Sequence, residues 1–328
     1  MSVEVRAPAA MSPPERTPLV VAVVGPTAVG KTALALRIAA AVGGEIVGAD
    51  SRQVYRYLDI GTGKPAAAER AIAAHHAIDV VSPDEPFDVA DYRGLARQAI
   101  AGITARGRPV VLCGGSGLYV KAVLRGLFCG PKADPALRRR LEAEDVPPGT
   151  LHRRLGDCDP EAAARIHWRD RARVIRALEV FELTGRPIST WQRGHGFGEM
   201  PYRSTTIGLI RDRDALRAAI AGRCEEMVRL GLPDEVRALW ERGYGPELAP
   251  LRTLGYRHMG MYIRGECTLA AALADMVGDT CRYAKRQLTW FRHDAEVSWF
   301  DAGTDADAAL QAARRFVGSG GEGGGPVP

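Results

Sequence analysis

A glycine-rich segment near the N-terminus has the residue types and spacing of a phosphate-binding loop, Gly25-Pro26-Thr27-Ala28-Val29-Gly30-Lys31-Thr32. It follows the apolar run 19–24 and leads into the helical pattern 33–40, the order of strand, loop and helix that such a loop requires. Its glycines let backbone N–H groups turn inward, the helix N-terminus adds partial positive charge, and Lys31 adds a full charge. Thr32 is placed to reach a Mg²⁺ ion bound to phosphate. A turn of purely structural role is the alternative, which the agreement of loop, lysine, threonine and flanking elements disfavours.

A carboxylate follows the next apolar run along the chain. Asp50 comes directly after residues 45–49, so we expect it at the end of a buried strand beside the phosphate loop. There it can bind Mg²⁺ or act as a general base; the alternative is that it caps the turn that follows. Arg52 and Gln53 offer hydrogen bonds that suit a nucleobase or a phosphate, unless they line a solvated loop.

An arginine lies on the apolar stripe of a helix predicted after Asp212. The apolar positions that recur at helical spacing are Leu216, Ile220, Met227 and Leu230. Arg223 falls on the same stripe rather than on the solvent-exposed face of the helix. An inward-facing arginine must pair with an anion, which is either a structural carboxylate or a phosphate of the ligand.

Basic and aromatic side chains interleave near the C-terminus, in residues 282–292. Because cations hold phosphates and rings stack on splayed bases, this mixture suits RNA; an amphipathic helix with a solvated basic face is the alternative. The histidines have no metal-ligand spacing, so we assign no transition metal. No strand after the phosphate loop ends in the apolar-run-then-acid pattern of a Walker B, which weakens an ATPase or GTPase interpretation.

Alternating strand and helix patterns must position these residues. Apolar runs at 45–49, 77–81 and 109–113 are predicted strands, and the last leads into Gly114-Gly115-Ser116-Gly117 and a helix. Strands that alternate with helices predict an α/β fold with a doubly wound parallel sheet, in which ligands bind at the carboxyl ends of the strands. The phosphate loop, Asp50 and residues 114–117 are therefore expected to share one cleft.

The pattern changes near residue 132. Strand patterns cease, arginines cluster on helical stretches, and a strand returns at residues 204–210. The predicted organisation, in chain order, is a disordered N-terminal tail (1–17), the first part of a P-loop core (18–131), a helical insertion (132–200), the completion of the core with further helices (201–316), and a disordered glycine-rich tail (317–328).

The composition is that of a soluble globular protein of 328 residues. Its formal net charge of +5 weakly favours an anionic partner. The six cysteines are scattered and form no C-x-x-C pair, which argues against a zinc knuckle and a disulfide framework, so we expect a cytoplasmic protein. No apolar run approaches the roughly 20 residues that span a bilayer, and no signal-type segment is present. The true start of translation is either Met1 or Met11.

Several of these motifs together resemble the bacterial tRNA dimethylallyltransferase (tRNA isopentenyltransferase) family. The matching stretches are residues 25–32, Ala49-Asp50-Ser51-Arg52-Gln53-Val54-Tyr55, residues 58–65, Gly114-Gly115-Ser116-Gly117-Leu118-Tyr119, residues 176–181, Leu254-Gly255-Tyr256 and residues 283–292. The resemblance extends from residue 19 to residue 300, and several of the motifs are long and unlike those of other P-loop proteins.

The resemblance implies transfer of the dimethylallyl group of dimethylallyl diphosphate to N6 of the adenine immediately 3′ of the anticodon, in tRNAs that read codons beginning with U. The products are then N6-dimethylallyladenosine and diphosphate, and Mg²⁺ assists. It also implies a P-loop NTPase-like parallel-sheet core with an inserted, mainly helical tRNA-binding domain that clamps the anticodon stem-loop. We expect a monomer without membrane association.

The resemblance also assigns roles to single residues. It places the diphosphate loop at Gly25 to Thr32, the general base at Asp50 and the hydrogen bond to the target adenine at Ser116. It places the helical arginine that touches the diphosphate at Arg223. Contacts to tRNA fall on Asp50, Ser51, Arg52, Gln53, Ser116, Arg138, Arg173, Arg176, Arg252, Arg257, Lys285, Arg286 and Gln287.

The chain departs from the family pattern at three places. Ala219-Ile220 stands where many relatives carry Arg-Ile, Cys281 stands where relatives often have arginine, and Arg169-Asp170 replaces Asn-Asp. Three other functions stay open. A small-molecule P-loop kinase and an isopentenyltransferase acting on free adenine nucleotides both leave the arginine-rich insertion unexplained. A non-catalytic RNA-binding module is disfavoured because Asp50 and the loop residues are intact.

Overall fold

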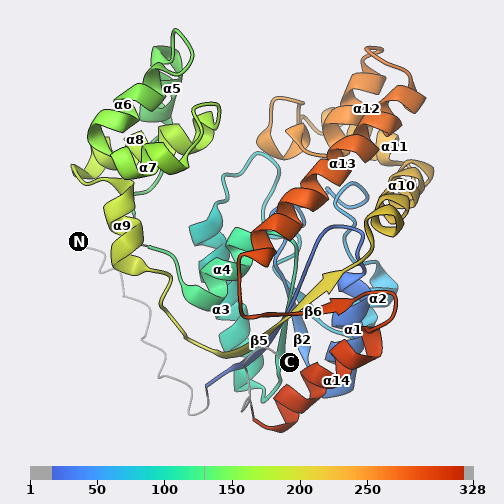
Figure 1. Cartoon of the computed structure of the whole chain (residues 1–328). Coiled ribbons are helices and arrows are strands. Elements are labelled where there is room, and N and C mark those ends of the chain that lie inside the picture. The colour runs from blue at the N-terminus through green and yellow to red at the C-terminus, as the bar shows by residue number, and fades with distance from the viewer. Residues whose placement is uncertain (1–16, 129, 321–328) are drawn as a thin grey trace, which may run out of the picture. The chain divides into compact units, whose positions relative to one another are not determined.

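The computed structural model describes residues 17–128 and 130–320 (Figure 1). The chain divides into a core unit, Met1–Leu124 with Met200–Pro328, and a helical unit, Arg125–Glu199. The expected tails at 1–17 and 317–328, and the alternative start at Met11, lie almost wholly outside the described residues. Of the C-terminal tail, only residues 317–320 are described, and the last helix of the chain runs into them as far as Gly318.

The core unit is built on a parallel sheet, which confirms the predicted α/β fold. Among the described residues the sheet has six strands in the order β3-β2-β4-β1-β5-β6. Their bounds are β1 (Leu19–Val24), β2 (Glu45–Gly48), β3 (His75–His76), β4 (Val110–Cys113), β5 (Arg203–Ile210) and β6 (Val297–Asp301). In the register of the sheet Val23 lies opposite Cys113, and Val24 lies opposite Gly208. The loops that follow β1, β4 and β5 therefore emerge side by side.

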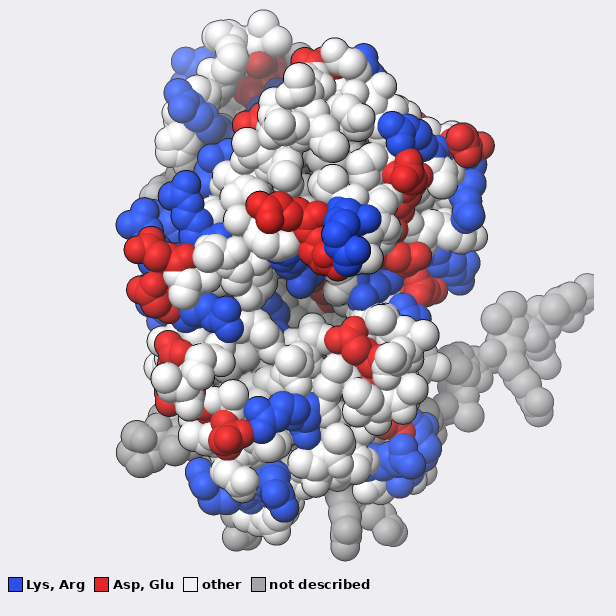
Figure 2. All heavy atoms as spheres, turned by 90° about the vertical axis from the view of Figure 1, so that its right-hand side faces the viewer, with Lys and Arg blue, Asp and Glu red and all other residues white. Residues whose placement is uncertain are grey.

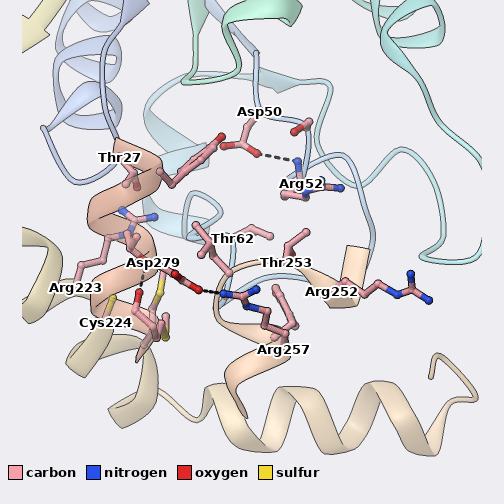
Figure 3. A pocket seen from close by; sticks show the side chains of 18 of the residues that line it. Thr27, Asp50, Arg52, Thr62, Arg223, Cys224, Arg252, Thr253, Arg257 and Asp279 are labelled. Atoms are coloured by element: carbon pink, nitrogen blue, oxygen red, sulfur yellow. Dashed lines mark hydrogen bonds and ion pairs between the residues drawn. The ribbon is translucent and has the colours of Figure 1, made fainter. Parts of the chain in front are cut away.

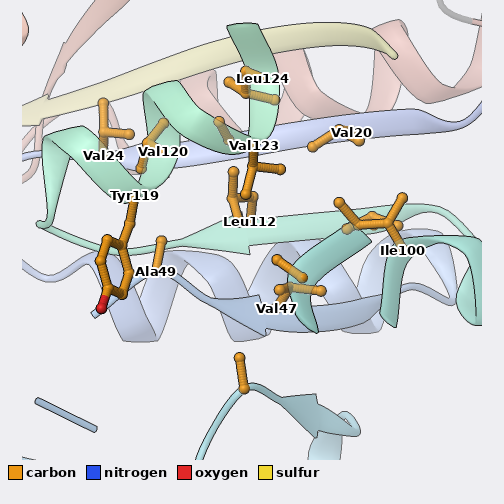
Figure 4. Close-up of a cluster of buried hydrophobic side chains, with 14 of the residues drawn as sticks. Val20, Val24, Val47, Ala49, Ile100, Leu112, Tyr119, Val120, Val123 and Leu124 are labelled. Atoms are coloured by element: carbon orange, nitrogen blue, oxygen red, sulfur yellow. The ribbon is translucent and has the colours of Figure 1, made fainter. Parts of the chain in front are cut away.

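Helices cover both faces of the sheet, which is why β1 is apolar throughout its length. Helices α3 (Val89–Ala105) and α4 (Gly117–Arg125) pack on one face, where Val20 and Val24 of β1 enter their apolar cluster (Figure 4). Helices α1 (Lys31–Val42) and α14 (Ala306–Gly318) pack on the other face, and their cluster contains Val21 and Val23. Alternate residues of one buried strand thus stabilise two separate layers.

One predicted strand was wrong. The expected strand at 77–81 is not formed, and β3 instead occupies His75–His76, just before it. The left-handed backbone of Ala77 (φ 62°) and Asp79 (φ 57°) interrupts an extended chain there. The carboxylate of Asp79 accepts hydrogen bonds from Lys64 Nζ at 2.5 Å and from Arg70 at 3.2 Å, so this segment forms a turn. Strand β6 and helix α14 were not anticipated at all.

Further helices of the core unit lie beyond the carboxyl ends of the strands (Figure 1). They are α10 (Arg213–Arg229), α11 (Leu232–Glu241), a 3-10 turn (Ala249–Arg252), α12 (Tyr256–Ile263) and the long α13 (Leu269–Arg292). A short helix, α2 (Ala67–Ile72), precedes β3. On α10 the predicted stripe is buried at Ile220 and Met227, whereas Leu230, one residue beyond the helix end, is 56% exposed.

The helical unit contains no strand among its described residues. Its helices are α5 (Pro135–Glu144), α6 (Thr150–Cys158), α7 (Pro160–Arg165), α8 (Arg171–Thr184) and α9 (Ile188–His195). They share an apolar cluster that includes Leu141, Leu155 and Leu178. The unit begins at residue 125, earlier than the expected 132. In the described part of the chain, no helix is both long enough and apolar enough to cross a membrane.

Candidate functional site

A cavity of about 570 Å³ opens at the carboxyl edge of the sheet (Figure 3). It brings together elements far apart in sequence: the phosphate loop through Thr27, the end of β2 through Asp50, and helix α10 through Arg223. Other lining residues come from the loop between β2 and α2, from the 3-10 turn and the residue after it, and from α12 and α13. They include Ser51, Arg52, Gly61, Thr62, Arg252, Thr253, Arg257, Asp279, Tyr283 and Arg286. Thr27 of the phosphate loop and Asp50 thus line one cavity, whereas residues 114–117, which were predicted to share it, are not among its lining residues.

The backbone conformation of the phosphate loop requires glycine at the first position of the loop, as Gly25 shows. Gly25 has φ 142°, and a side chain there would approach the Leu209 carbonyl oxygen to 2.6 Å, so only glycine fits. Gly30 has φ 109° and Lys31 opens helix α1. Lys31 Nζ donates to the Pro26 carbonyl at 2.7 Å, which folds the lysine back over the loop. Burial lowers the pKa of Lys31 to about 8, against the opposing influence of Cys113 and Asp50.

Gln287 links the phosphate loop to the glycine turn after β4. Its Oε1 accepts from the Thr27 N–H at 2.8 Å, and its Nε2 donates to the Gly115 carbonyl at 2.9 Å. Gln287 is only 7% exposed, and a side chain on Gly115 would strike its Nε2. Gln287 was expected among the tRNA contacts; because both ends of its amide are bonded inside the protein, it holds the two loops together instead.

Replacing Gln287 by glutamate is expected to lower the free energy of unfolding by about 1–3 kcal/mol, since the buried Gly115 carbonyl loses its donor and faces a carboxylate. Urea denaturation followed by circular dichroism measures this. Lys285→Ala, on the exposed side of the same helix, is the control and should change stability by less than about 0.5 kcal/mol. An unchanged midpoint for Gln287→Glu would show that the amide does not hold the loops.

In the described part of the chain, the two carboxylate oxygens of Asp50 have different environments. Its Oδ1 accepts from the Arg52 N–H at 2.8 Å and from the Gln53 N–H at 3.4 Å, so it caps the turn after β2. Within the described residues its Oδ2 has no hydrogen-bond partner. The side chain lines the cavity (Figure 3), so one oxygen is fixed by the backbone and the other is free for a ligand.

Ser116 lies beside Asp50, in the turn after β4. Its Oγ accepts from the Ser51 N–H at 3.1 Å, which joins two of the expected site residues. Tyr283, which lines the same cavity, hydrogen-bonds with Ser116. Burial raises the pKa of Tyr283 to about 12, and the nearby Asp50 carboxylate adds to the shift, so the phenol stays protonated. Sequence reasoning missed Tyr283 as a site residue because it was grouped with the basic run of α13.

Arg223 has no carboxylate partner among the described residues. Its guanidinium lies against Gly63, where any side chain would collide with it. Gln53 Nε2 donates to the carbonyls of Thr62 and Gly63, at 3.2 and 3.1 Å, and so supports the loop on which Arg223 rests. Of the two anions proposed for Arg223, the structural carboxylate is thus missing. Gln53, expected to contact tRNA, has its amide nitrogen engaged in this support.

Four arginines surround the mouth of the cavity: Arg52, Arg252, Arg257 and Arg286. Arg257 is held by an ion pair with Asp279, and the guanidinium of Arg286 lies 5.7 Å from the ring centre of Tyr283. Their charges suit the phosphates of a nucleic acid. Lys285 faces the other side of α13, where it lines a second cavity between α10 and α13. It therefore lies apart from the four arginines around the first cavity.

In the helical unit the expected arginines have different environments. Arg138 donates twice to the carboxylate of Glu179, at 2.8 and 2.9 Å. Arg176 donates to the same carboxylate at 2.5 Å and to the Pro131 carbonyl at 2.8 Å. Although burial opposes it, hydrogen bonds from both arginines lower the pKa of Glu179. Both arginines therefore stabilise the packing around Glu179, whereas Arg173 is 66% exposed and forms an ion pair with Asp170.

The site offers few protein ligands for a cation. No cluster of three His, Cys, Asp or Glu side chains suited to a metal occurs in the described part of the chain. The Thr32 hydroxyl, in the first turn of α1, has no hydrogen-bond partner within the described residues. Mg²⁺ commonly takes one or two protein oxygens and completes its shell with water and phosphate oxygens. The loop fits a cation that is brought together with a diphosphate.

The net positive charge does not by itself mark the binding surface. Figure 2 shows basic and acidic side chains interspersed over the face seen there. The cations best placed for a nucleic acid are therefore the arginines around the cavity and the exposed arginines of the helical unit.

The chain is similar to known proteins over most of its length. The family model described as IPP transferase matches residues 53–294. A tRNA dimethylallyltransferase of Syntrophobacter fumaroxidans is 52% identical, with 86% of this chain and 83% of the relative covered, and one of Desulfosudis oleivorans is 47% identical, with 92% and 96% covered. A solved structure of a tRNA isopentenylpyrophosphate transferase from Bacillus halodurans is 41% identical, has a TM-score of 0.69, and covers 92% of this chain and 96% of its own.

Proposed function

The chain belongs to the tRNA dimethylallyltransferase family, and we propose that it transfers the dimethylallyl group of dimethylallyl diphosphate to N6 of the adenine immediately 3′ of the anticodon, in tRNAs that read codons beginning with U. The observation that carries this proposal is the convergence of the phosphate loop, Asp50 and Arg223 on one cavity, with no carboxylate partner for Arg223 among the described residues. The loop and the arginine suit a diphosphate. The Asp50 oxygen that does not cap the turn suits the exocyclic amine of adenine, which would be the nucleophile.

The diphosphate is a good leaving group once its charge is balanced. The buried Lys31, Arg223 and the amides of the loop supply this balance as the bond between carbon and oxygen breaks. Thr32 and the diphosphate oxygens would hold Mg²⁺, which supplies further positive charge to the leaving oxygens. The prenyl carbon, and not a phosphorus atom, is then the site of attack.

The exocyclic amine of adenine is a weak nucleophile because its lone pair is delocalised into the ring. Asp50 Oδ2 would accept a hydrogen bond from N6–H and take the proton as the new C–N bond forms, a role worth roughly 10²–10⁴-fold. The hydroxyls of Ser116 and Tyr283, which lie together beside Asp50, would orient the ring. Extruding the base from its stack costs a few kcal/mol, which contacts from the surrounding arginines would offset.

We include in the proposal that the helical unit grips the anticodon stem-loop and that the enzyme works as a cytoplasmic monomer. The kinase and the adenylate isopentenyltransferase are not favoured, because the similar proteins are named for their action on tRNA.

Mass analysis of tRNA nucleosides tests the proposal. After incubation with dimethylallyl diphosphate and Mg²⁺, the anticodon-loop adenosine should gain one dimethylallyl unit. AMP supplied in competition should neither be modified nor slow the reaction. Transfer to AMP in preference to tRNA would instead identify an adenylate isopentenyltransferase.

The affinity for dimethylallyl diphosphate is expected to fall as the pH rises from 7 to 9. Since the pKa of Lys31 is about 8, the ammonium is charged below this value and neutral above it; roughly nine-tenths of it is charged at pH 7 and one-tenth at pH 9. Isothermal titration at both values measures the change. Lys31→Met has no charge at this position at either pH, so it is the control for titration of the ligand itself. It should bind dimethylallyl diphosphate weakly at both pH 7 and pH 9. Equal pH dependence in the two proteins would contradict the assignment.

A further inference from the structure

Trp168 is an exposed indole in the segment that joins α7 to α8. The residue is 40% exposed, and the guanidinium carbon of Arg169 lies 4.9 Å from the ring centre. The His167 ring lies 5.8 Å away at an interplanar angle of 28°. Three planar groups that can stack on other planar groups therefore stand together at the surface of the helical unit.

The segment that carries the indole is held by its own hydrogen bonds. The Arg169 N–H donates to His167 Nδ1 at 3.2 Å, and the Asp170 N–H donates to the His167 carbonyl at 2.8 Å. Asp170 caps helix α8 by accepting from the Arg173 N–H at 3.4 Å. Beneath the ring lies Gly149, where a side chain would reach Trp168 Cε3 at 3.7 Å. The backbone that carries the indole is thus held in place by the hydrogen bonds of residues 167–170.

The surroundings of this indole are cationic. Arg169 and Arg173 are both exposed, and Asp170, the one acidic residue between them, is already engaged as the helix cap. An exposed aromatic ring between cations has the composition of a site that stacks bases and neutralises phosphates. A protein partner would instead call for a larger apolar surface without this charge.

We propose that Trp168 stacks on an unpaired base or a helix-end base pair of the tRNA substrate, while Arg169 and Arg173 contact the adjoining phosphates. The inference rests on the proposed function, because tRNA is the RNA that this enzyme would bind. It also gives a role to Arg169-Asp170, the pair that departs from the family pattern just ahead of α8.

The test measures the dissociation constant of unmodified tRNA without the prenyl donor. Trp168→Ala should raise it by about 5- to 100-fold, the range found for loss of one stacked base. Trp168→Phe keeps a stacking ring and should stay within about threefold of the wild type, whereas Trp168→Leu keeps only bulk and should resemble Trp168→Ala. Leu183→Ala, another exposed apolar residue of the same unit (43%), should leave the dissociation constant unchanged.

The salt dependence separates stacking from charge. Trp168→Ala should leave the slope of log affinity against log salt unchanged, while Arg169→Ala and Arg173→Ala should each reduce it by about one. Transfer assays should show a raised KM for tRNA with kcat retained at saturation. Wild-type affinity in Trp168→Ala, or in Trp168→Leu, would overturn the proposal. Tight binding through Trp168 without any prenyl transfer would leave this inference standing and refute the proposed function.

Discussion

Replacement of Asp50 by asparagine is expected to reduce kcat for prenyl transfer by about 10²–10⁴-fold, while the dissociation constant for tRNA stays within about twofold. Asparagine retains an oxygen in the place of Oδ1, so it can still accept from the Arg52 and Gln53 N–H groups that define the turn. What it loses is the oxygen that can take a proton from N6 of adenine. The result therefore separates the base from the cap, two roles that one carboxylate combines.

Single-turnover transfer to labelled tRNA measures the chemical step directly. Asp212→Asn is a matched control, because Asp212 caps helix α10 by accepting from the Asp214 and Ala215 N–H groups and does not line the cavity. That variant should transfer at the wild-type rate. Near-normal turnover of Asp50→Asn would remove Asp50 from the role of base and leave it as a cap alone.

Replacement of Arg223 by glutamine is expected to lower kcat by about 10²–10³-fold, the loss found when one donor to a developing anion is removed. The guanidinium has no carboxylate partner within the described residues, so its removal leaves no buried protein charge behind. Folding should therefore survive, and thermal unfolding should change little. Because the contact proposed for Arg223 is with the leaving diphosphate, we expect tRNA affinity to stay unchanged.

Product inhibition by inorganic diphosphate gives an independent measurement of the same contact, and its inhibition constant should rise in Arg223→Gln. Arg217→Gln is the control: Arg217 is an exposed residue on the same helix and lines the second cavity instead. Should Arg217→Gln lose as much activity as Arg223→Gln, the effect would belong to the general charge of α10 and not to a contact with diphosphate.

The parts of the site that depend on local chain geometry could be predicted from the sequence. The phosphate loop needs only a strand, two glycines and a helix start, and all are contiguous in residues 19–42. Arg223 could be placed by counting helical turns from Ile220 to Met227, both of which are buried. In each case a short repeat or motif determines where the side chain points.

Other features depend on partners distant in sequence. Gln287 bonds to Thr27, 260 residues away, and nothing in the run 282–292 distinguishes its inward side from the outward side of Lys285. Arg138 looks like a free cation until the fold brings it to Glu179 on another helix, which Arg176 reaches from three residues away on the same helix. The segment 77–81 is apolar enough for a strand, but Ala77 and Asp79 have left-handed backbones, and the Asp79 carboxylate bonds to Lys64 and Arg70, which lie earlier in the chain.

The amide of Gln287 has a thermodynamic consequence for the two substrates. It joins the loop that would hold the diphosphate to the turn that would hold the adenine, with one hydrogen bond to each. We therefore expect a ligand that orders one loop to affect the order of the other loop as well. The binding free energies of the prenyl donor and of tRNA then contain a common coupling free energy. Reciprocity then requires that the prenyl donor change tRNA affinity by the same factor by which tRNA changes donor affinity, whichever arrives first.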